Sequence, residues 1–190
     1  MAARGHSWVD EGAGSKSTSG DRDHVYFIGF MGAGKSTVAR RLGRMLKRTH
    51  IDTDRRIEDI AKARIDQIFA REGEEGFRDR EVALLTDIAR MRSVLVSCGD
   101  GIVEREESRG IIARTGFAVY LEIDVDDTFS NVSNYRARPL LKDRESALEL
   151  LETRRPLYES MADLTIDARG GDFSRVTRAV ADALWKEGLL

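Results

Sequence analysis

The feature of this 190-residue chain that most constrains its fold is the alternation of short apolar runs with longer amphipathic stretches. The apolar runs have the length of buried strands, and the stretches between them repeat apolar residues at helical spacing. This alternation predicts an α/β fold, in which helices flank a parallel sheet and binding groups lie at the carboxyl ends of the strands. Five strands are expected, at residues 25–30, 50–51, 94–98, 117–123 and 164–166, and the second is the weakest.

The first 22 residues differ from the remainder of the chain. They are rich in glycine, serine and charged residues, and Trp8 and Val9 are their only sizeable apolar pair. Because such a segment cannot cover a core, we expect residues 1–22 to form a flexible tail. Residues 23–190 are expected to form one domain, since 41% of the chain is hydrophobic.

The charge and cysteine content narrow the classes of partner. A formal net charge of −2 provides no general basic surface for nucleic acid. Cys98 is the only cysteine, so no internal disulfide forms, and we interpret it as a small buried residue at a strand end. The N-terminus lacks the apolar stretch of a signal peptide or membrane span. We therefore expect a cytoplasmic monomer that binds neither nucleic acid nor membranes.

Residues 29–37 read Gly-Phe-Met-Gly-Ala-Gly-Lys-Ser-Thr and match the pattern G-x-x-x-x-G-K-[ST]. The segment follows a predicted strand and precedes a predicted helix, which is the context that a phosphate-binding loop requires. Its backbone N–H groups would face the phosphates, Lys35 would reach the β- and γ-phosphates, and Ser36 would bind Mg²⁺. A nucleoside triphosphate site is therefore predicted. The loop does not select the reaction, but a single small domain favours a small-molecule kinase over a motor.

Asp52 and Asp54 are spaced two residues apart, just after the weakest strand. In an extended strand end, both carboxylates would face the same way and project into one cleft. One would orient an acceptor hydroxyl and receive its proton, while the other would support the metal ion. The alternative is that Asp52 or Thr53 only caps the helix that begins near Arg55.

Two arginines, Arg78 and Arg154, lie outside simple runs of like charge. Guanidinium forks that converge from different elements would hold a substrate carboxylate well, although a lone surface arginine usually only solvates a helix. Residues 131–143 form a polar stretch with Arg136 and Arg138 that is too long for a tight turn. We interpret it as a lid that closes over the nucleotide, and the alternative is a solvated loop.

Six motifs occur in order from about residue 25 to the C-terminus: G-F-M-G-A-G-K-S-T, I-D-T-D-R-R-I-E, E-G-E-E-G-F-R, S-C-G-D-G, R-P-L-L and R-R-P-L-Y. This series resembles that of the shikimate kinase family. The loop alone is shared with many families, whereas the ordered set with its spacing is much more specific.

The resemblance implies a P-loop fold of the nucleoside-monophosphate-kinase type and transfer of the ATP γ-phosphate to the 3-hydroxyl of shikimate, in aromatic amino-acid biosynthesis. It implies a nucleotide site formed by Gly32, Ala33, Gly34, Lys35, Ser36, Thr37 and Arg138. Mg²⁺ would be the cofactor, held by Ser36 and Asp52. Catalysis would depend on Lys35, Asp54 as the base, and Arg138. The acceptor would contact Asp54, Arg78, Asp100 and Arg154.

The chain departs from the family pattern at two places. Asp100 occupies the middle of a turn that usually contains three glycines. Its side chain could point outward, approach Mg²⁺ or repel the anionic substrate, and we favour the outward orientation. The lid also lacks an arginine at about Asn131, for which Arg136 could compensate.

These departures leave two alternatives open. One is a kinase for another small hydroxy acid, which Asp100 favours. The other is a nucleotide-binding regulatory homologue that has lost catalysis. A pure binding module, however, would not need the loop, the two aspartates and the arginines together.

Overall fold

The computed structural model describes residues 22–131 and 143–190. A five-stranded sheet forms its centre, with every neighbouring pair of strands parallel and the order β2-β3-β1-β4-β5. The strands are β1 (His24–Ile28), β2 (His50–Asp52), β3 (Leu95–Ser97), β4 (Gly116–Glu122) and β5 (Leu164–Asp167). The predicted α/β class and all five predicted strands are confirmed. Residues 1–21 of the predicted tail and 132–142 of the predicted lid lie outside the described residues, so the proposed division of the chain stays a prediction.

Strand β1 lies at the centre of the sheet and is buried along its whole length. Val25 is in register with Leu95 of β3 on one side and with Phe117 of β4 on the other. Both faces of this strand are covered, so its residues form a continuous apolar run instead of alternating with polar ones.

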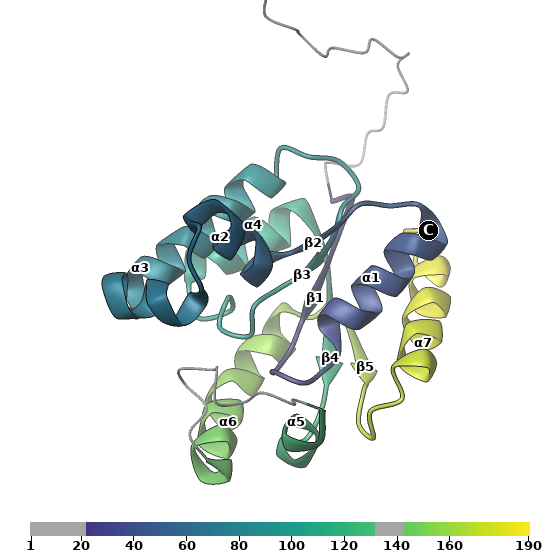
Figure 1. The fold of residues 1–190 in the computed structure, drawn as a ribbon. Coiled ribbons are helices and arrows are strands. Elements are labelled where there is room, and N and C mark those ends of the chain that lie inside the picture. The colour runs from purple at the N-terminus through teal and green to yellow at the C-terminus, as the bar shows by residue number, and fades with distance from the viewer. Residues whose placement is uncertain (1–21, 132–142) are drawn as a thin grey trace, which may run out of the picture.

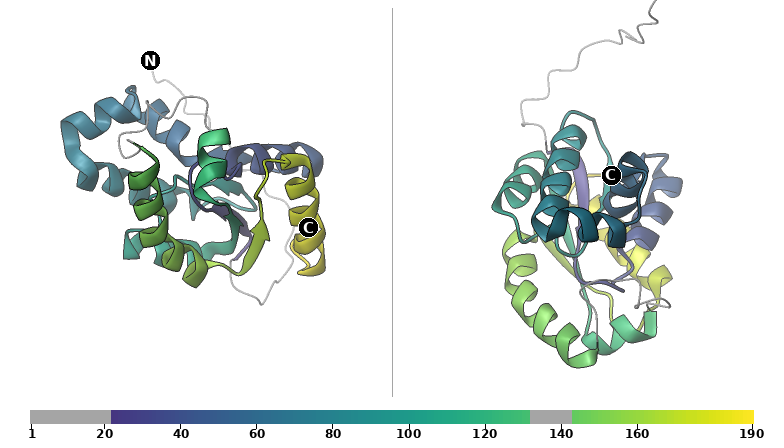
Figure 2. Two further views of the ribbon diagram at one scale, coloured as in Figure 1. Left: turned by 90° about the horizontal axis from the view of Figure 1, so that it is seen from below. Right: turned by 60° about the vertical axis from the view of Figure 1, so that its left-hand side comes forward.

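Helices cover both faces of the sheet (Figure 1). Helices α1 and α7 pack against each other on one face, and α4 and α6 contact β4 from the other (Figures 1 and 2). At the β2 edge, α2 packs on α3, which is kinked at Gly73. The helices are α1 (Lys35–Leu46), α2 (Thr53–Ala61), α3 (Ile65–Ile88), α4 (Glu106–Thr115), α5 (Val125–Asn131), α6 (Arg144–Met161) and α7 (Phe173–Lys186). Within residues 22–131 and 143–190, none of them has the length and apolar character needed to cross a membrane.

The carboxyl ends of three neighbouring strands bring distant motifs together. Asp52 at the end of β2 is in register with Ser97 at the end of β3, which is also in register with Phe27 of β1. Cys98 follows β3 and is buried, as expected, with its N–H donating to the carbonyl of Phe27 at 3.0 Å. The phosphate loop, the start of α2 and the turn after β3 therefore meet at one edge of the sheet.

Candidate active site

The phosphate loop connects β1 to α1 in the conformation that its glycines allow. Gly34 is the N-cap of α1 and has a left-handed backbone with φ of 82°. A Cβ atom at this position would also collide with the ring of Phe173, at the start of α7. Only glycine fits both the dihedral angle and the space at this position, which also lines a cavity at the N-terminus of α1.

Lys35 and Ser36 follow this turn at the start of α1. The Lys35 ammonium is buried and donates to the carbonyls of Gly29 at 2.6 Å and Phe30 at 2.9 Å. The lysine therefore holds the loop while it lines a cavity of about 370 Å³. This cavity is lined by loop residues together with acidic and neighbouring side chains: Met31, Gly32, Gly34, Lys35, Ser36, Thr37, Asp52, Asp54, Cys98, Gly99, Asp100, Asn131 and Phe173.

Asp52 combines a structural role with a place in the cavity. It is the N-cap of α2, with its Oδ1 accepting from the N–H of Arg55 at 3.1 Å, and its Oδ2 accepts from Ser97 Oγ at 2.9 Å. Ser97 is in turn 2.9 Å from His50 Nε2. The helix cap that we considered as an alternative is thus present, but it does not remove Asp52 from the cavity.

Asp54 lines the same cavity as Asp52, but its backbone conformation differs from the predicted one. We expected an extended strand end to align it with Asp52, whereas α2 already begins at Thr53 and places Asp54 in its first turn. The predicted extended conformation is therefore wrong, because the Asp52 cap starts the helix immediately. The predicted shared cleft is confirmed, since both carboxylates line this cavity and also a second cavity that adjoins it.

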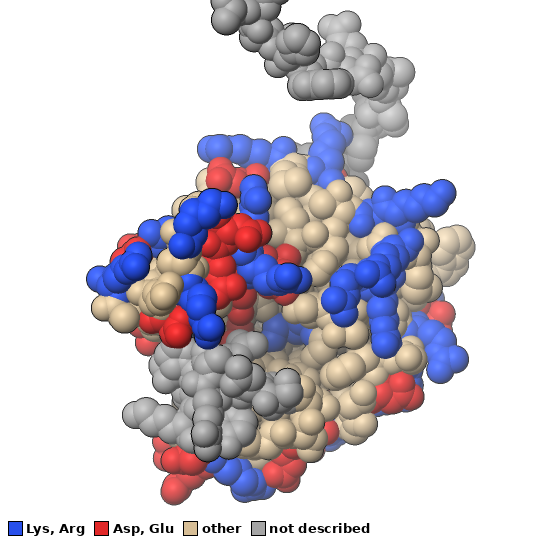
Figure 3. Space-filling view, viewed as in Figure 1, with Lys and Arg blue, Asp and Glu red and all other residues tan. Residues whose placement is uncertain are grey.

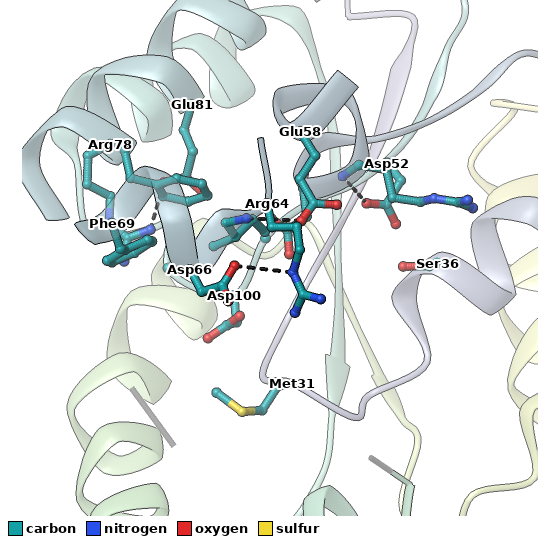
Figure 4. Close-up of a pocket in the computed structure, with 16 residues that line it drawn as sticks. Met31, Ser36, Asp52, Glu58, Arg64, Asp66, Phe69, Arg78, Glu81 and Asp100 are labelled. Atoms are coloured by element: carbon teal, nitrogen blue, oxygen red, sulfur yellow. Dashed lines mark hydrogen bonds and ion pairs between the residues drawn. The ribbon is translucent and has the colours of Figure 1, made fainter. Parts of the chain in front are cut away.

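The second cavity, of about 490 Å³, adjoins the first and shares Met31, Ser36, Asp52, Asp54, Gly99 and Asp100 with it. Figure 4 places Ser36 and Asp52 on one side of this cavity, and Arg78 and Glu81 on the other. Figure 3 shows acidic side chains gathered along the wall of the hollow beneath α2 and α3. A donor site at the loop and a small acceptor site beside it are the arrangement expected of a kinase.

Arg78 of α3 and Arg154 of α6 converge, as predicted. Arg78 lines the second cavity, whereas the buried Arg154 lines neither of the two cavities. Glu104 bridges them: its Oε2 is 2.9 Å from Arg78 Nη2, and its Oε1 is 2.7 Å from Arg154 Nη2. Arg78 also pairs with Glu74 at 2.7 Å and Glu81 at 2.8 Å. Burial alone would lower the pKa of Arg78, but the neighbouring carboxylates raise this pKa, so the guanidinium group stays charged.

The orientation of Asp100 contradicts the favoured prediction. Its side chain does not point outward, because its Oδ2 accepts from Arg154 Nη1 at 2.6 Å. The flanking glycines explain this: a Cβ at Gly99 would lie 2.5 Å from Asp54 Oδ1, and one at Gly101 would collide with the Arg78 guanidinium. The turn thus packs directly against charged groups, and the buried Arg154 attracts the only carboxylate in the turn.

Two carboxylates that pair with these arginines, Glu81 and Glu104, were missed by sequence reasoning. Glu81 follows Arg78 by three residues on one helix, a spacing that could have indicated an ion pair. Its burial raises the pKa of the Glu81 carboxyl to about 7, although Arg78 opposes the shift. Glu104 stands in the charged run Glu-Arg-Glu-Glu, and no local signal distinguishes it from a solvated residue.

Helix α5 attaches the start of the predicted lid to the phosphate loop. Thr128 Oγ1 donates to the carbonyl of Met31 at 2.9 Å, and Asn131 Nδ2 donates to that of Gly32 at 3.1 Å. Asn131, where the family pattern has an arginine, thus contacts the loop itself. Arg136 and Arg138 lie outside the described residues, so their predicted roles stay predictions.

Comparisons with known proteins agree with this architecture. The family model described as shikimate kinase matches residues 31–185. The curated shikimate kinase of Actinobacillus pleuropneumoniae serotype 5b is 41% identical over 149 residues, 77% of this chain and 86% of that protein.

Solved structures give the same result. A shikimate kinase from Acinetobacter baumannii in complex with shikimate has a TM-score of 0.83 and 31% identity, covering 88% of this chain and 95% of that one. A deoxyadenosine kinase from M. mycoides with bound dATP shares the fold alone, with a TM-score of 0.57 and 14% identity over 85% of this chain and 98% of that one. The predicted P-loop fold is thereby confirmed, and the chain belongs to the shikimate kinase family.

Proposed function

We propose that this chain transfers the γ-phosphate of ATP to the 3-hydroxyl of shikimate. One observation carries the proposal: Asp54 lines both adjoining cavities, one at the phosphate loop and the other beside Arg78. A carboxylate at this junction would contact the hydroxyl of an acceptor whose own carboxylate lies toward the arginines. The family membership supports both the donor and the acceptor.

On the donor side, the loop residues Gly32 to Thr37 would hold the phosphates through backbone N–H groups and the N-terminus of α1. Lys35 would exchange its contacts with the loop carbonyls for the β- and γ-phosphates. The position of the loop supports this role, because Gly34, Lys35 and Ser36 at the N-terminus of α1 line the first cavity. The positively charged side chain of Arg138 would lie beside the phosphates during transfer.

On the acceptor side, Asp54 would orient the reacting hydroxyl and take its proton as the bond to phosphorus forms. Arg78 and Arg154 would bind the acceptor's carboxylate, since they approach one another closely enough to share Glu104.

The residues near the loop fit Mg²⁺ as the cofactor. Ser36 offers a hydroxyl and Asp52 a carboxylate on one cavity wall, and these are the hard oxygen ligands that Mg²⁺ prefers. Within residues 22–131 and 143–190, no three acidic, histidine or cysteine side chains cluster as a metal cage. Such a site suits an ion held mainly by phosphates and water. When bound, Mg²⁺ would neutralise charge on the β- and γ-phosphates.

We further propose that the enzyme acts as a monomer in the cytoplasm. The single cysteine, which is buried after β3, is consistent with a reducing compartment. Size-exclusion chromatography with light scattering would test the oligomeric state, and a dimer that persists on dilution would contradict it.

A coupled assay of ADP release over a panel of small hydroxy acids tests the proposed reaction. Shikimate should be turned over with a higher kcat/KM than any other acid in the panel. Its product should carry phosphate on the 3-hydroxyl, as measured by ³¹P and proton NMR. Phosphorylation of another acid in preference to shikimate would support the alternative acceptor, and ATP binding without turnover would support the regulatory homologue.

A further inference from the structure

Glu104 lies between the two arginines that would hold the acceptor's carboxylate. Its Oε1 is 2.8 Å from Arg154 Nε and 2.7 Å from Arg154 Nη2, and its Oε2 is 2.9 Å from Arg78 Nη2. One carboxylate shared by two guanidinium groups is the arrangement expected of a bound carboxylate ligand. The chain thus supplies from its own sequence the group that an anionic acceptor would bring.

Asp100 occupies the remaining nitrogen of the same guanidinium. Its Oδ2 accepts from Arg154 Nη1 at 2.6 Å, and Glu104 Oε1 accepts from Arg154 Nε at 2.8 Å. Arg154 Nη2 lies 2.7 Å from the same Glu104 oxygen but makes no hydrogen bond within the described residues. The Arg154 side chain is only 1% exposed, which strengthens these contacts by excluding water. An incoming carboxylate would therefore compete with Asp100 and Glu104 for the guanidinium group of Arg154.

The charge balance around the arginines favours displacement over simple addition. Two guanidinium groups meet the carboxylates of Glu74, Glu81, Asp100 and Glu104. The pKa of Glu81 is raised to about 7, so this carboxyl is partly neutral near pH 7, but the carboxylates of Glu74, Asp100 and Glu104 still outnumber the two guanidinium groups. A further carboxylate would therefore be repelled unless one of the internal groups moved away.

The carboxylates of Asp100 and Glu104 differ in how they can move away from Arg154. The Glu104 side chain is 32% exposed, so rotation about its own bonds can move the carboxylate into water. The backbone of Asp100 is held, because Tyr158 Oη donates to its carbonyl at 2.6 Å and the N–H of Gly99 donates to Thr53 Oγ1 at 2.8 Å. The Asp100 side chain is 14% exposed and can only turn about this fixed backbone.

We propose that Asp100 and Glu104 determine the acceptor affinity and charge preference of this enzyme by competing with the acceptor's carboxylate for Arg154 and Arg78. The inference rests on the proposed function, because it assumes that the two arginines bind the acceptor. It identifies both residues as specificity-determining groups that weaken the binding of an anionic acceptor.

Isosteric neutral variants test the competition. Asp100→Asn and Glu104→Gln should each lower the KM for shikimate by about ten-fold, with the change in KM exceeding any change in kcat, because a ground-state competitor is removed. Calorimetric titration with shikimate in the presence of MgADP should show the same gain in affinity.

A second acceptor separates competition for the arginines from general opening of the pocket. The amide of shikimate, which has no negative charge, should gain less than about two-fold in kcat/KM from either substitution. The control variant is Glu75→Gln, which removes a carboxylate from the same part of α3. Glu75 pairs with Arg105 instead of Arg78 or Arg154. It should leave the KM for both acceptors unchanged.

The outcomes distinguish this inference from the proposed function. A shikimate KM that is unchanged or higher in both isosteric variants, with Tm values showing that they are folded, would overturn the inference alone. Equal gains for the acid and the amide would also overturn it. If neither the wild type nor any variant phosphorylates shikimate, the proposed function fails and the inference fails with it.

Discussion

The phosphate loop differs in its construction from the arginine–carboxylate cluster, which consists of Arg78, Arg154, Asp100 and Glu104. The loop is one contiguous segment, and its shape follows from Gly34 at the N-terminus of α1 and from Lys35 bonding to carbonyls of its own loop. The cluster joins α3, the turn after β3 and α6 through charged side chains distant in sequence. Backbone N–H groups can bind an anion without a change of partner. Buried guanidinium groups, in contrast, form ion pairs with carboxylates of the chain when no ligand is bound. The donor side is thus ready for an anion, while internal carboxylates occupy the acceptor side.

The largest effect is expected at Asp54, which joins the two regions. Asp54→Asn should lower kcat by about 10²- to 10⁴-fold, because the amide cannot accept the hydroxyl proton. ATP affinity, measured by calorimetry, should stay near the wild-type value, since the loop is built without Asp54. Asp59→Asn, an exposed position on the same helix, serves as the control. Wild-type-like turnover by Asp54→Asn would refute its role as the base.

A substitution at Arg154 should affect only the acceptor side. Arg154→Lys keeps the charge but loses the planar fork, so the acceptor KM should rise by about 10- to 100-fold. The KM for ATP should not change, because the partners of Arg154 within the described residues are Asp100 and Glu104 and not the phosphate loop. The neighbouring Arg155→Lys is the matched control, since that residue lies 3.9 Å from Glu122 and away from Asp100. Equal changes in both KM values would argue against two separable regions.

A substitution at Gly34 should have the opposite selectivity. Gly34→Ala places a Cβ against the Phe173 ring at a φ of +82°, so we expect about 2 kcal/mol lower stability and a raised KM for ATP. Gly170→Ala is the matched control, because Gly170 has a φ of +79° but open space around its Cβ position. Chemical denaturation should show a loss of about 1 kcal/mol for the control. Similar losses for both variants would mean that the contact with Phe173 contributes little.

The last prediction concerns the pH dependence of stability that the buried carboxyl of Glu81 gives the acceptor side. Burial raises the pKa of Glu81 from its ordinary 4.5 to about 7 in the folded protein. Between these values the folded state keeps a proton that the unfolded state has lost, so this contribution to the free energy of unfolding falls as pH rises from 4.5 and levels off above about 7. The slope is at most about 1.4 kcal/mol per pH unit.

Glu81→Gln removes this titration while keeping the size of the side chain. Its free energy of unfolding should therefore fall less steeply than that of the wild type between pH 4.5 and 7, as measured by denaturant titrations across this range. Parallel curves for the two proteins would show that the buried carboxyl titrates normally.

The fold could be predicted from sequence because its signals are local. Each apolar run became a strand, and the phosphate loop formed between the strand and the helix that its motif requires. The helix expected to begin near Arg55 begins two residues earlier, at Thr53, because periodicity is a poor guide to a boundary over two or three residues. The shared cleft of Asp52 and Asp54 was still correctly predicted.

By itself, the sequence determined the α/β class, the position of the triphosphate loop and the convergence of Arg78 with Arg154. Only the tertiary structure decided what those arginines bind in the absence of a substrate. Asp100 turned inward and Glu104 became a bridge because burial makes an unpaired guanidinium costly, so that it pairs with whatever carboxylate the fold brings near. That choice depends on distances between α3, α6 and the turn after β3, which residue order alone does not fix.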